Sequence, residues 1–536
     1  MRPVLLLLYF AVACACQAVE RWVYVSDNLL VDKRVEELEE LLQRASKAGY
    51  THILLADSKF CRLGEMPDRY FKNVGRIKQA ATTANISIIP AVFPVGYSND
   101  LLYQDPNLAE GPPVKDALFV VQGSVAKLES DPPVTLRGGD MADLKLWSMR
   151  DDNMVAYAGA VRVTDPKGAN ARIAQKVKLA PFRQYHISVR VKTADFAGTP
   201  EVKAIANGRV LNFDNLGARR TQDWHTHHVI FNSLTNHEAM IYLGAWGANT
   251  GSLWWDDVVI EEVGLVNLIR REGAPFHARV ENGRELVEGT DFEPVRDPNM
   301  GTKPYAGCYD VYHEPPVIHT KGLADGTRLR VSYHHVATIY DGQAMMDIAE
   351  PRALELLRDQ ARRVHELFHA GGYMMSHDEI RVLGWSEAFQ RRGMTPGQLI
   401  AENTRECVKI LRALKPDVRI YTWSDMFDPA HNAVPGPYYL VNGPLTGSWE
   451  GLDPSVIIMQ WHGDTLAGRQ ASLKFFADCG HPQILAAYYD AGPKQVRDWL
   501  DAAQGVKGVN GVMYTTWQSN YRDLEAIGRL LRDAGW

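Results

Sequence analysis

The sequence is poor in cysteine, with six in 536 residues. Two of them, Cys14 and Cys16, lie in an apolar N-terminal segment. The rest are widely spread and form no close-spaced CxxC pair of the kind that binds zinc; they are Cys61, Cys308, Cys407 and Cys479. This spacing excludes a disulfide scaffold, so the folded protein is expected to depend on its apolar core.

Runs of basic residues are also missing. The formal net charge is −6 and no stretch is rich in Lys or Arg, which argues against nucleic acid as a partner. After the N-terminal segment, no apolar run is long enough to span a membrane. With 46% hydrophobic and 23% charged residues, the composition is that of a globular protein with two or three domains.

The N-terminal segment reads MRPVLLLLYFAVACACQAVE and has the features of a secretory signal peptide: a basic residue, an apolar run and then small residues. We expect a signal peptide over residues 1–18, with cleavage after Ala15 or Ala18, and a secreted or periplasmic mature protein. Attachment of a lipid to Cys14 or Cys16 is the less favoured alternative.

Eight apolar segments with the character of buried strands alternate with amphipathic helical segments. Three lie in residues 19–117 and five in residues 346–536. They read WVYVSD, HILLAD, ISIIPAVF, YMMSHDE, RIYTWSD, VIIMQWHG, ILAAYYD and GVMYTTW. Strands that are apolar throughout are typical of parallel sheets covered on both faces. The predicted fold class is therefore α/β, with a (β/α)8 TIM barrel made in two parts.

Between these two parts the pattern changes. Residues 118–264 hold short strand candidates separated by turns, which predicts an inserted antiparallel β-sandwich (jelly-roll) domain. Residues 265–345 are expected to form a β-rich connecting segment. Its stretch Arg328–Asp341 is either a ninth strand or part of a long excursion between the third and fourth barrel strands.

The stretch WWDDVVIEE in the inserted region resembles a late strand of jelly-roll carbohydrate-binding modules. The resemblance implies that aromatic side chains of this region stack on sugar rings. The candidates are Trp224, Trp246, Trp254 and Trp255. The alternative, favoured for any single one of them, is that the tryptophan is a core residue.

Acidic and aromatic residues gather at the ends of the eight predicted strands, where barrels of this kind place the active site. Aromatic rings suit the apolar faces of sugars, and carboxylates bind hydroxyl groups and move protons. This pattern predicts an oligo- or polysaccharide substrate. The residues expected to bind it are Asp57, Arg62, Tyr97, His377, Trp423, Asp425, Trp461, Tyr488 and Trp517. For Asp57 and Asp425 the alternative is that the acid caps a helix or orders a loop.

Two adjacent acids, Asp378 and Glu379, end the fourth predicted strand. Like charges in proximity raise the pKa of one group and keep it protonated near neutral pH. Glycosidic cleavage needs such an acid, because the leaving oxygen must be protonated as positive charge develops on the sugar carbon. Adjacent side chains of a strand point to opposite faces, so both reach one pocket only if the strand ends here. We therefore expect Asp378 and Glu379 to be catalytic.

The Asp378–Glu379 pair resembles the Asp-Glu pair of glycoside hydrolase family 20, the exo-β-N-acetylhexosaminidases. The stretch IIPAVFPVGYS at residues 88–98 is similar to the third-strand segment of that family. The stretches TWSD, MQWHG and YTTWQ lie where the family has tryptophans in its pocket. The resemblance spans both barrel parts, and the acid pair is its one specific motif.

The resemblance implies a substrate-assisted mechanism without metal or cofactor, in which the 2-acetamido oxygen of the sugar is the nucleophile. Glu379 is then the general acid and later the general base, and Asp378 orients the acetamido group. Tyr488 donates to the acetamido oxygen, and Arg62 takes the place of a sugar-clamping arginine. The tryptophans that wall the acetamido group are Trp423, Trp461 and Trp517.

The chain departs from this family at two places. Ser376 and His377 stand before the acid pair, where the family usually has glycines. Ala91 follows Pro90, where the family has an acid. These departures indicate a distant relative, and they leave open a different sugar at the non-reducing end.

Other functions stay open from the sequence. One is a metal-dependent carbohydrate hydrolase or deacetylase, with ligands drawn from His334, His335, His377, Asp378 and His462. Another is a secreted glycan-binding protein without activity. The acid pair itself could simply form salt bridges, with partners among Arg62, Arg381 and Lys59. The favoured function is a secreted glycoside hydrolase, exo-acting on β-linked N-acetylhexosaminides or related sugars; the oligomeric state is not assigned.

Overall fold

The structure is a computed structural model that describes residues 19–163, 170–461, 463–490 and 492–536. The predicted signal peptide, with Cys14 and Cys16, lies outside the described residues, as does His462 of the metal alternative. Within the described part, no helix has both the length and the apolar character that a membrane crossing needs.

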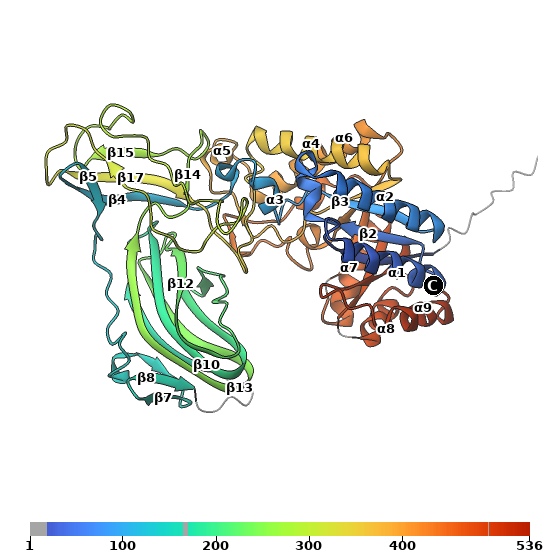
Figure 1. The fold of residues 1–536 in the computed structure, drawn as a ribbon, viewed down its shortest axis with the longest axis horizontal. Coiled ribbons are helices and arrows are strands. Elements are labelled where there is room, and N and C mark those ends of the chain that lie inside the picture. Colours follow the sequence, from blue (N-terminus) through green and yellow to red (C-terminus); the bar gives the residue numbers. More distant parts are fainter. Residues whose placement is uncertain (1–18, 164–169, 462, 491) are drawn as a thin grey trace, which may run out of the picture.

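Eight parallel strands close into a barrel. In barrel order they are β1 (Glu20–Ser26), β2 (His52–Ala56), β3 (Ser87–Val92), β18 (Gly372–Met375), β20 (Arg419–Trp423), β22 (Ile457–Gln460), β23 (Gln483–Tyr489) and β24 (Val509–Thr515). They correspond to the eight segments expected from the sequence, so the closed parallel barrel is confirmed. In Figure 1 it forms the right-hand part, where the blue start and the orange-red end of the chain lie side by side.

Helices cover the outside of the barrel. They are α1 (Asp32–Ala48), α2 (Asp68–Thr83), α4 (Pro351–Phe368), α6 (Pro396–Leu414), α7 (Leu466–Asp478), α8 (Pro493–Ala502) and α9 (Leu524–Asp533). Their apolar residues recur every three or four positions, as Val35, Leu38, Leu42 and Ala45 do on the buried face of α1. Shorter helical pieces are α3 (Asn99–Leu102), α5 (Glu387–Gln390), η1 (Ser58–Cys61), η2 (Leu63–Glu65), η3 (Pro106–Leu108), η4 (Leu144–Leu146), η5 (Asp425–Phe427) and η6 (Ser448–Gly451).

Alternate residues of the barrel strands fill the interior. Trp22, Met374 and Tyr421 belong to one buried cluster inside the barrel. Two positions further along their strands, Trp423 belongs to the same cluster and Tyr24 packs against it. The intervening residues pack in a separate core between barrel and helices. Because side chains alternate along a strand, this series determines which residues reach the mouth of the barrel.

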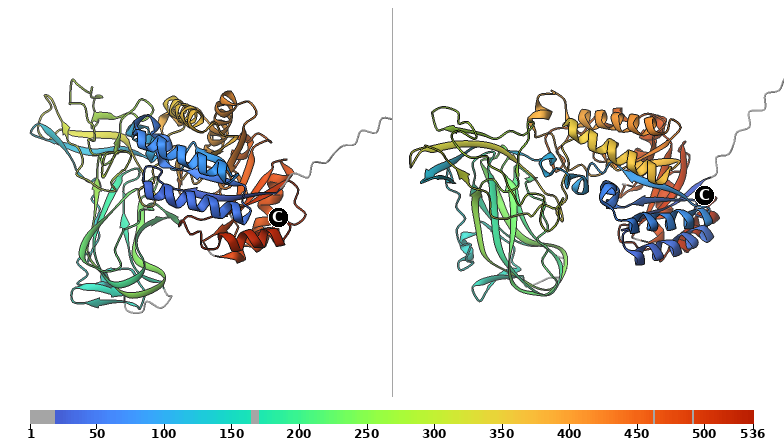
Figure 2. Two further views of the ribbon diagram at one scale, coloured as in Figure 1. Left: turned by 45° about the vertical axis from the view of Figure 1, so that its right-hand side comes forward. Right: turned by 45° about the horizontal axis from the view of Figure 1, so that its top comes forward.

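The chain between β3 and β18 forms antiparallel sheets on one side of the barrel, in both views of Figure 2 as in Figure 1. One sheet has eight strands: β6 (Met149–Arg150), β7 (Met154–Tyr157), β8 (Ala160–Val163), β9 (Ala171–Lys178), β10 (Gln184–Ala206), β11 (Arg209–Val210), β12 (Gln222–Asn232) and β13 (Glu238–Val263). The other has six: β4 (Pro113–Gln122), β5 (Val125–Leu128), β14 (Leu268–Ile269), β15 (His277–Val280), β16 (Ile318–His319) and β17 (Arg328–His335). A small parallel pair, β19 (Val382–Leu383) and β21 (Leu440–Val441), lies near the barrel mouth.

The strand pairing differs from the expected division of this region. β4 pairs with β17, and β5 pairs with β16, so residues 113–128 join the stretch expected as a connector at 265–345. The expected boundary at residue 118 therefore falls inside β4. Because β17 pairs antiparallel in this outer sheet, the ambiguous stretch Arg328–Asp341 belongs to the excursion and is not a ninth barrel strand.

The four tryptophans considered for sugar stacking have different surroundings. Trp255 is fully buried in the core. Each of the other three has an arginine guanidinium 5.1–5.8 Å from its ring centre, which occupies one ring face. The pairs are Trp224 with Arg190, Trp246 with Arg172 and Trp254 with Arg162.

Candidate active site

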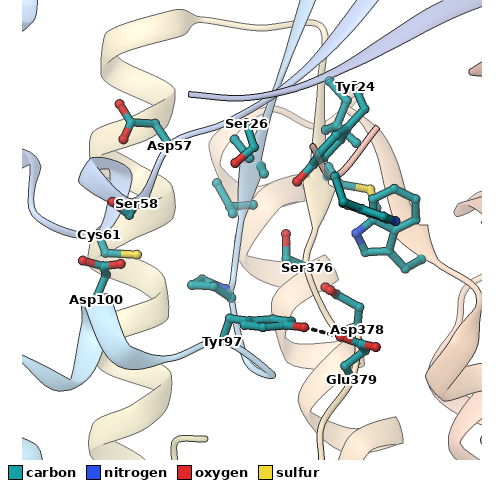
Figure 3. Close-up of a pocket in the computed structure, with 18 of the residues that line it drawn as sticks. Tyr24, Ser26, Asp57, Ser58, Cys61, Tyr97, Asp100, Ser376, Asp378 and Glu379 are labelled. Atoms are coloured by element: carbon teal, nitrogen blue, oxygen red, sulfur yellow. Dashed lines mark hydrogen bonds between the residues drawn. The ribbon is translucent and has the colours of Figure 1, made fainter. Parts of the chain in front are cut away.

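A cavity of about 580 Å³ opens at the carboxyl ends of the barrel strands. Figure 3 shows Asp57 and Asp100 on one side of it, and Asp378 and Glu379 on the other. The structure thus brings together seven of the residues selected from the sequence as lining residues: Asp57, Tyr97, Asp378, Glu379, Trp423, Trp461 and Trp517.

Aromatic rings form a continuous wall of this cavity. The ring centroids of Trp423 and Trp517 are 5.6 Å apart, and Tyr24 lies 4.8 Å from Trp517 and 6.0 Å from Trp423. Tyr24 was missed in the prediction of site residues. Its signal is its position on β1, two residues after the inward-facing Trp22, since alternation turns both to the interior.

Asp378 reaches the cavity because it continues the inward series of Met374 and Ser376. Within the described residues, no other residue donates a hydrogen bond to its carboxyl group, and no cation forms an ion pair with it. Burial, and then the carboxyl groups of Asp425 and Glu379, raise the pKa of Asp378 well above its ordinary value. Such surroundings favour the neutral acid.

Asp425 lies two positions after Trp423 and is fully buried. One of its carboxyl oxygens accepts a hydrogen bond from the backbone N–H of Glu379 at 2.9 Å, and the other accepts one from Nε1 of Trp461 at 3.4 Å. Burial raises the pKa of Asp425 to about 7. The raised pKa values of Asp378 and Asp425 favour a retained proton in this part of the cavity wall near neutral pH.

Glu379 reaches the same cavity because the strand has ended. β18 stops at Met375, and Glu379 has a φ of 51°, in the left-handed region. The hydroxyl of Tyr97 donates to its Oε2, and Nη2 of Arg381 lies 2.5 Å from its Oε1. The sequence left open that the two acids only form salt bridges with Arg62, Arg381 or Lys59. Among the described residues, the pair Glu379–Arg381 forms such a bridge. Each oxygen of the Glu379 carboxyl group thus already has a partner.

Arg381 is nearly buried and is held on several sides. Its Nη1 donates to Oε1 of Gln343 at 2.5 Å. Its guanidinium carbon lies 5.3 Å from the ring centre of Tyr340 and 5.0 Å from that of Tyr439. Gln343 and Tyr340 come from the end of the excursion, so residues outside the barrel strands fix the cation beside Glu379.

The loop after β3 carries Tyr97 to the acid pair. The residue before it, Gly96, passes so close to the chain at Asp378 that a Cβ atom there would lie 1.8 Å from the Asp378 carbonyl oxygen. Only glycine fits this approach. The position of Tyr97 against Glu379 thus depends on a residue without a side chain.

Asp57 lines the cavity, but its carboxyl group is engaged elsewhere. It accepts hydrogen bonds from the backbone N–H groups of Leu29 (3.1 Å) and Lys59 (3.0 Å) and from the hydroxyl of Tyr70 (2.9 Å). It caps η1. The capping alternative therefore describes Asp57 better than substrate binding does.

His377 lies outside the cavity. It falls between the inward-facing Ser376 and Asp378, so alternation turns it toward the helices. It is fully buried, and its Nε2 lies 3.0 Å from Oδ1 of Asn403 on α6. The expectation that His377 binds substrate is not met, because the side chain ties the strand to a helix instead.

Tyr488 also lies outside the cavity. The register of β23 shifts between Ala486 and Tyr488, and this irregularity removes Tyr488 from the inward series. Its ring stacks on Tyr514, and its hydroxyl donates to Asp523 at 3.0 Å. The Tyr488 hydroxyl, which was expected to donate to the acetamido oxygen, is thus bound to Asp523 outside the cavity.

Arg62, like Asp425, is also absent from the cavity lining. It forms an ion pair with Asp100 at 3.2 Å and donates to the carbonyl oxygen of Ala306 at 2.6 Å. Its guanidinium also lies 4.1 Å from the ring centre of Tyr103. It fastens the loops after β2 and β3 to the excursion, and Asp100, its partner, faces the cavity.

Of the histidines of the metal alternative, the three that the structure describes do not converge. His334 and His335 lie on β17 in the outer sheet, where burial lowers the pKa of each to about 4. Nε2 of His335 lies 3.1 Å from Nδ2 of Asn232, and Nε2 of His334 lies 3.3 Å from the carbonyl oxygen of Trp385. Across the described stretches, no group of three or more His, Cys, Asp or Glu side chains is placed to hold a metal ion.

Comparison with known proteins gives no family. No family model matches the chain, and no curated protein matches it in sequence. Among solved structures, the GH20 catalytic modules of a pneumococcal exo-β-D-N-acetylglucosaminidase are 8% identical, over 96% of this chain and 85% of that chain, with a TM-score of 0.37. A rhamnosidase from Novosphingobium sp. PP1Y is 11% identical, over 93% of this chain and 55% of that chain, with a TM-score of 0.34.

A smaller match lies with carbohydrate-binding modules. A CBM4 structure is 18% identical, over 24% of this chain and 85% of that chain, with a TM-score of 0.18. All of these TM-scores are too low to establish a common fold. The resemblance to glycoside hydrolase family 20 therefore stays a prediction, and a function is assigned from the geometry of the cavity alone.

Proposed function

We propose that this protein is a secreted glycoside hydrolase that removes the terminal sugar from β-linked N-acetylhexosaminides or related sugars by acid–base catalysis. One observation carries the proposal: two adjacent acids with unlike surroundings, Asp378 and Glu379, share a cavity walled by tryptophans. Glycosidic cleavage uses two such carboxyl groups, one that gives a proton to the leaving oxygen and one that faces the positive charge on the sugar.

The aromatic wall supports a sugar as the substrate. Tyr24, Trp423 and Trp517 present apolar ring faces next to the acids, and such faces pack against the C–H groups of a pyranose. The cavity has the volume of a small-molecule site, typically about 300–1,000 Å³. This size favours the end of a saccharide over an internal stretch of a long chain, in keeping with exo action.

The substrate-assisted mechanism divides the work between the two acids. One protonates the leaving oxygen while the bond from the sugar carbon to that oxygen breaks, and the acetamido oxygen bonds to the same carbon. The other faces the positive charge of the resulting oxazolinium ion. Water then attacks the sugar carbon while the bond from this carbon to the acetamido oxygen breaks, and the water proton returns to the first acid.

A panel of aryl glycosides tests this function. Nitrophenyl β-glycosides with and without the 2-acetamido group are incubated with the purified protein, and release of nitrophenol is followed. We expect turnover of the acetamido sugars. Turnover of plain glucosides alone would overturn the substrate-assisted mechanism, and no turnover of any member would overturn the proposed function.

A further inference from the structure

The two carboxyl groups differ in what surrounds them. Both oxygens of Glu379 have donors, the Tyr97 hydroxyl and the Arg381 guanidinium. Arg381 cannot readily swing away, because Gln343 accepts from it and the rings of Tyr340 and Tyr439 pack against it. The carboxyl group of Glu379 is therefore held between a hydroxyl and a nearly buried guanidinium.

The support of Arg381 extends into the inserted region. Phe213 packs on Tyr439, with ring centroids 4.6 Å apart, and its carbonyl oxygen accepts from the backbone N–H of Tyr340 at 3.2 Å. Arg209 donates to the carbonyl oxygens of Tyr439 and Val441. One loop of the inserted region thus holds both aromatic residues that pack on the guanidinium.

Asp378 has the opposite surroundings. The charged groups that act on it are Asp425 beyond β20 and Glu379 and Arg381 on its own loop, and the first two oppose its ionisation. The other titratable groups that face it are Tyr24 on β1 and Tyr97 after β3. The nearby cation is bound to Glu379. A proton in this cluster therefore lies on Asp378 or Asp425.

We infer from this geometry that Asp378 is the proton donor to the leaving group, and that Arg381 is a positioning residue that holds the Glu379 carboxyl group in place. Asp378 delivers the proton, because Asp425 is fully buried with its oxygens bound to the Glu379 N–H and to Trp461. This inference rests on the proposed function. It reverses the roles that the family resemblance implies for Asp378 and Glu379.

One turnover leaves the enzyme in its starting protonation state. The Asp378 proton moves to the glycosidic oxygen, the bond from the sugar carbon to that oxygen breaks, and the alcohol leaves. The acetamido oxygen bonds to the same carbon, and the cation so formed is balanced by Glu379. Water adds to the sugar carbon, the acetamido bond breaks, and the water proton returns to the Asp378 carboxylate.

Dependence on the leaving group tests the assignment. For Asp378→Asn, kcat/KM on phenyl N-acetyl-β-glucosaminide should fall by about 10²–10⁴-fold, while on the dinitrophenyl substrate, which leaves without protonation, it should fall by less than about tenfold. Azide should restore turnover and give a glycosyl azide, because it attacks without a general base. For Glu379→Gln, both substrates should lose similar factors, with no rescue by azide. The opposite pattern for the two variants would overturn the inference.

A second measurement needs no turnover. Infrared C=O bands of protonated carboxyl groups are recorded near neutral pH as difference spectra against the wild type, so that bands of other buried acids such as Glu110 and Asp214 cancel. Asp378→Asn should lose a band that Glu379→Gln keeps. Loss of the band in Glu379→Gln alone would overturn the inference. If Asp378→Asn does not fold, Asp378→Glu serves instead and should shift that band. A wild type that cleaves no aryl glycoside overturns the proposed function, whereas the infrared result still decides where the proton lies.

Discussion

Asp57 and Asp378 lie on opposite sides of one cavity, and their carboxyl groups are bound in opposite ways (Figure 3). Asp57 accepts from two backbone N–H groups and from the hydroxyl of Tyr70. Asp378 accepts from no other described residue, and Asp425 and Glu379 act on it as like charges. Both have a raised pKa through burial, but only for Asp378 do neighbouring carboxyl groups add to it as leading causes.

This difference separates an acid that builds the site from one that can work in it. Hydrogen bonds to Asp57 order the loop between β2 and η1, so the group is held in place and its lone pairs are used. The carboxyl group of Asp378 keeps its hydrogen-bonding capacity for a ligand. Lining a cavity is therefore not enough to identify a catalytic acid. The hydrogen bonds that its carboxyl group already accepts from the protein distinguish a structural acid from one that is available to a ligand.

Among these variants, the largest loss of activity is expected when Arg381 is replaced, and Arg62 serves as the matched control. Arg381→Met removes the cation that holds the Glu379 carboxyl group in place, so kcat should fall by about 10²-fold or more with a smaller change in KM. Arg381→Lys should recover part of the loss, because it restores a cation beside Glu379. Kinetics on the acetamido aryl glycosides measures both.

Arg62→Met is the control for this pair. It removes a cation that lies outside the cavity lining and contacts neither Asp378 nor Glu379, although its partner Asp100 faces the cavity, and we expect less than about a threefold change in kcat. Equal losses in Arg381→Met and Arg62→Met would contradict a special role for the cation at Glu379.

A smaller effect is expected in the pH dependence of stability. Asp425 has a folded-state pKa of about 7 against an ordinary value of 3.8, so the folded state binds more protons in this window. Its contribution to stability is fully present below about pH 4 and is lost as pH rises to about 7. In Asp425→Asn, the free energy of unfolding from urea titrations should therefore fall less steeply across this window than in the wild type.

Asp453 provides the control of opposite sign. Its hydrogen bond from Arg412 lowers its pKa, so its contribution to stability is present above its ordinary pKa and is lost only as pH falls below about 4. Asp453→Asn should leave the slope between about pH 4 and 7 as in the wild type. A wild-type slope in Asp425→Asn would contradict the raised pKa of Asp425.

Much of the barrel could be predicted from the sequence, because its strands are apolar throughout and end in polar residues. Asp378, Glu379 and the three tryptophans followed from that pattern. The alternation of side chains could have gone further: it points Tyr24 inward with Trp22, and it points His377 outward between Ser376 and Asp378.

Other parts of the site had no local signal. The register shift before Tyr488 turns a tyrosine out of the inward series, and such a shift depends on pairing with β24. Gln343 and Tyr340 reach Arg381 only because the excursion folds back to the barrel mouth. Contacts between segments so far apart in the chain are set by tertiary packing, which neither periodicity nor composition records.

The most direct measurement is the rate at which Asp378→Asn and Asp57→Asn hydrolyse phenyl N-acetyl-β-glucosaminide, per folded molecule, relative to the wild type. We predict a loss of about 10²–10⁴-fold for Asp378→Asn, because the leaving oxygen has no proton donor. For Asp57→Asn we predict a rate within about tenfold of the wild type, with the change appearing instead as a loss of stability of about 1–3 kcal/mol from its buried hydrogen bonds. Equal losses of rate in the two variants, or a larger loss in Asp57→Asn, would contradict the assignment of Asp378 as the working acid.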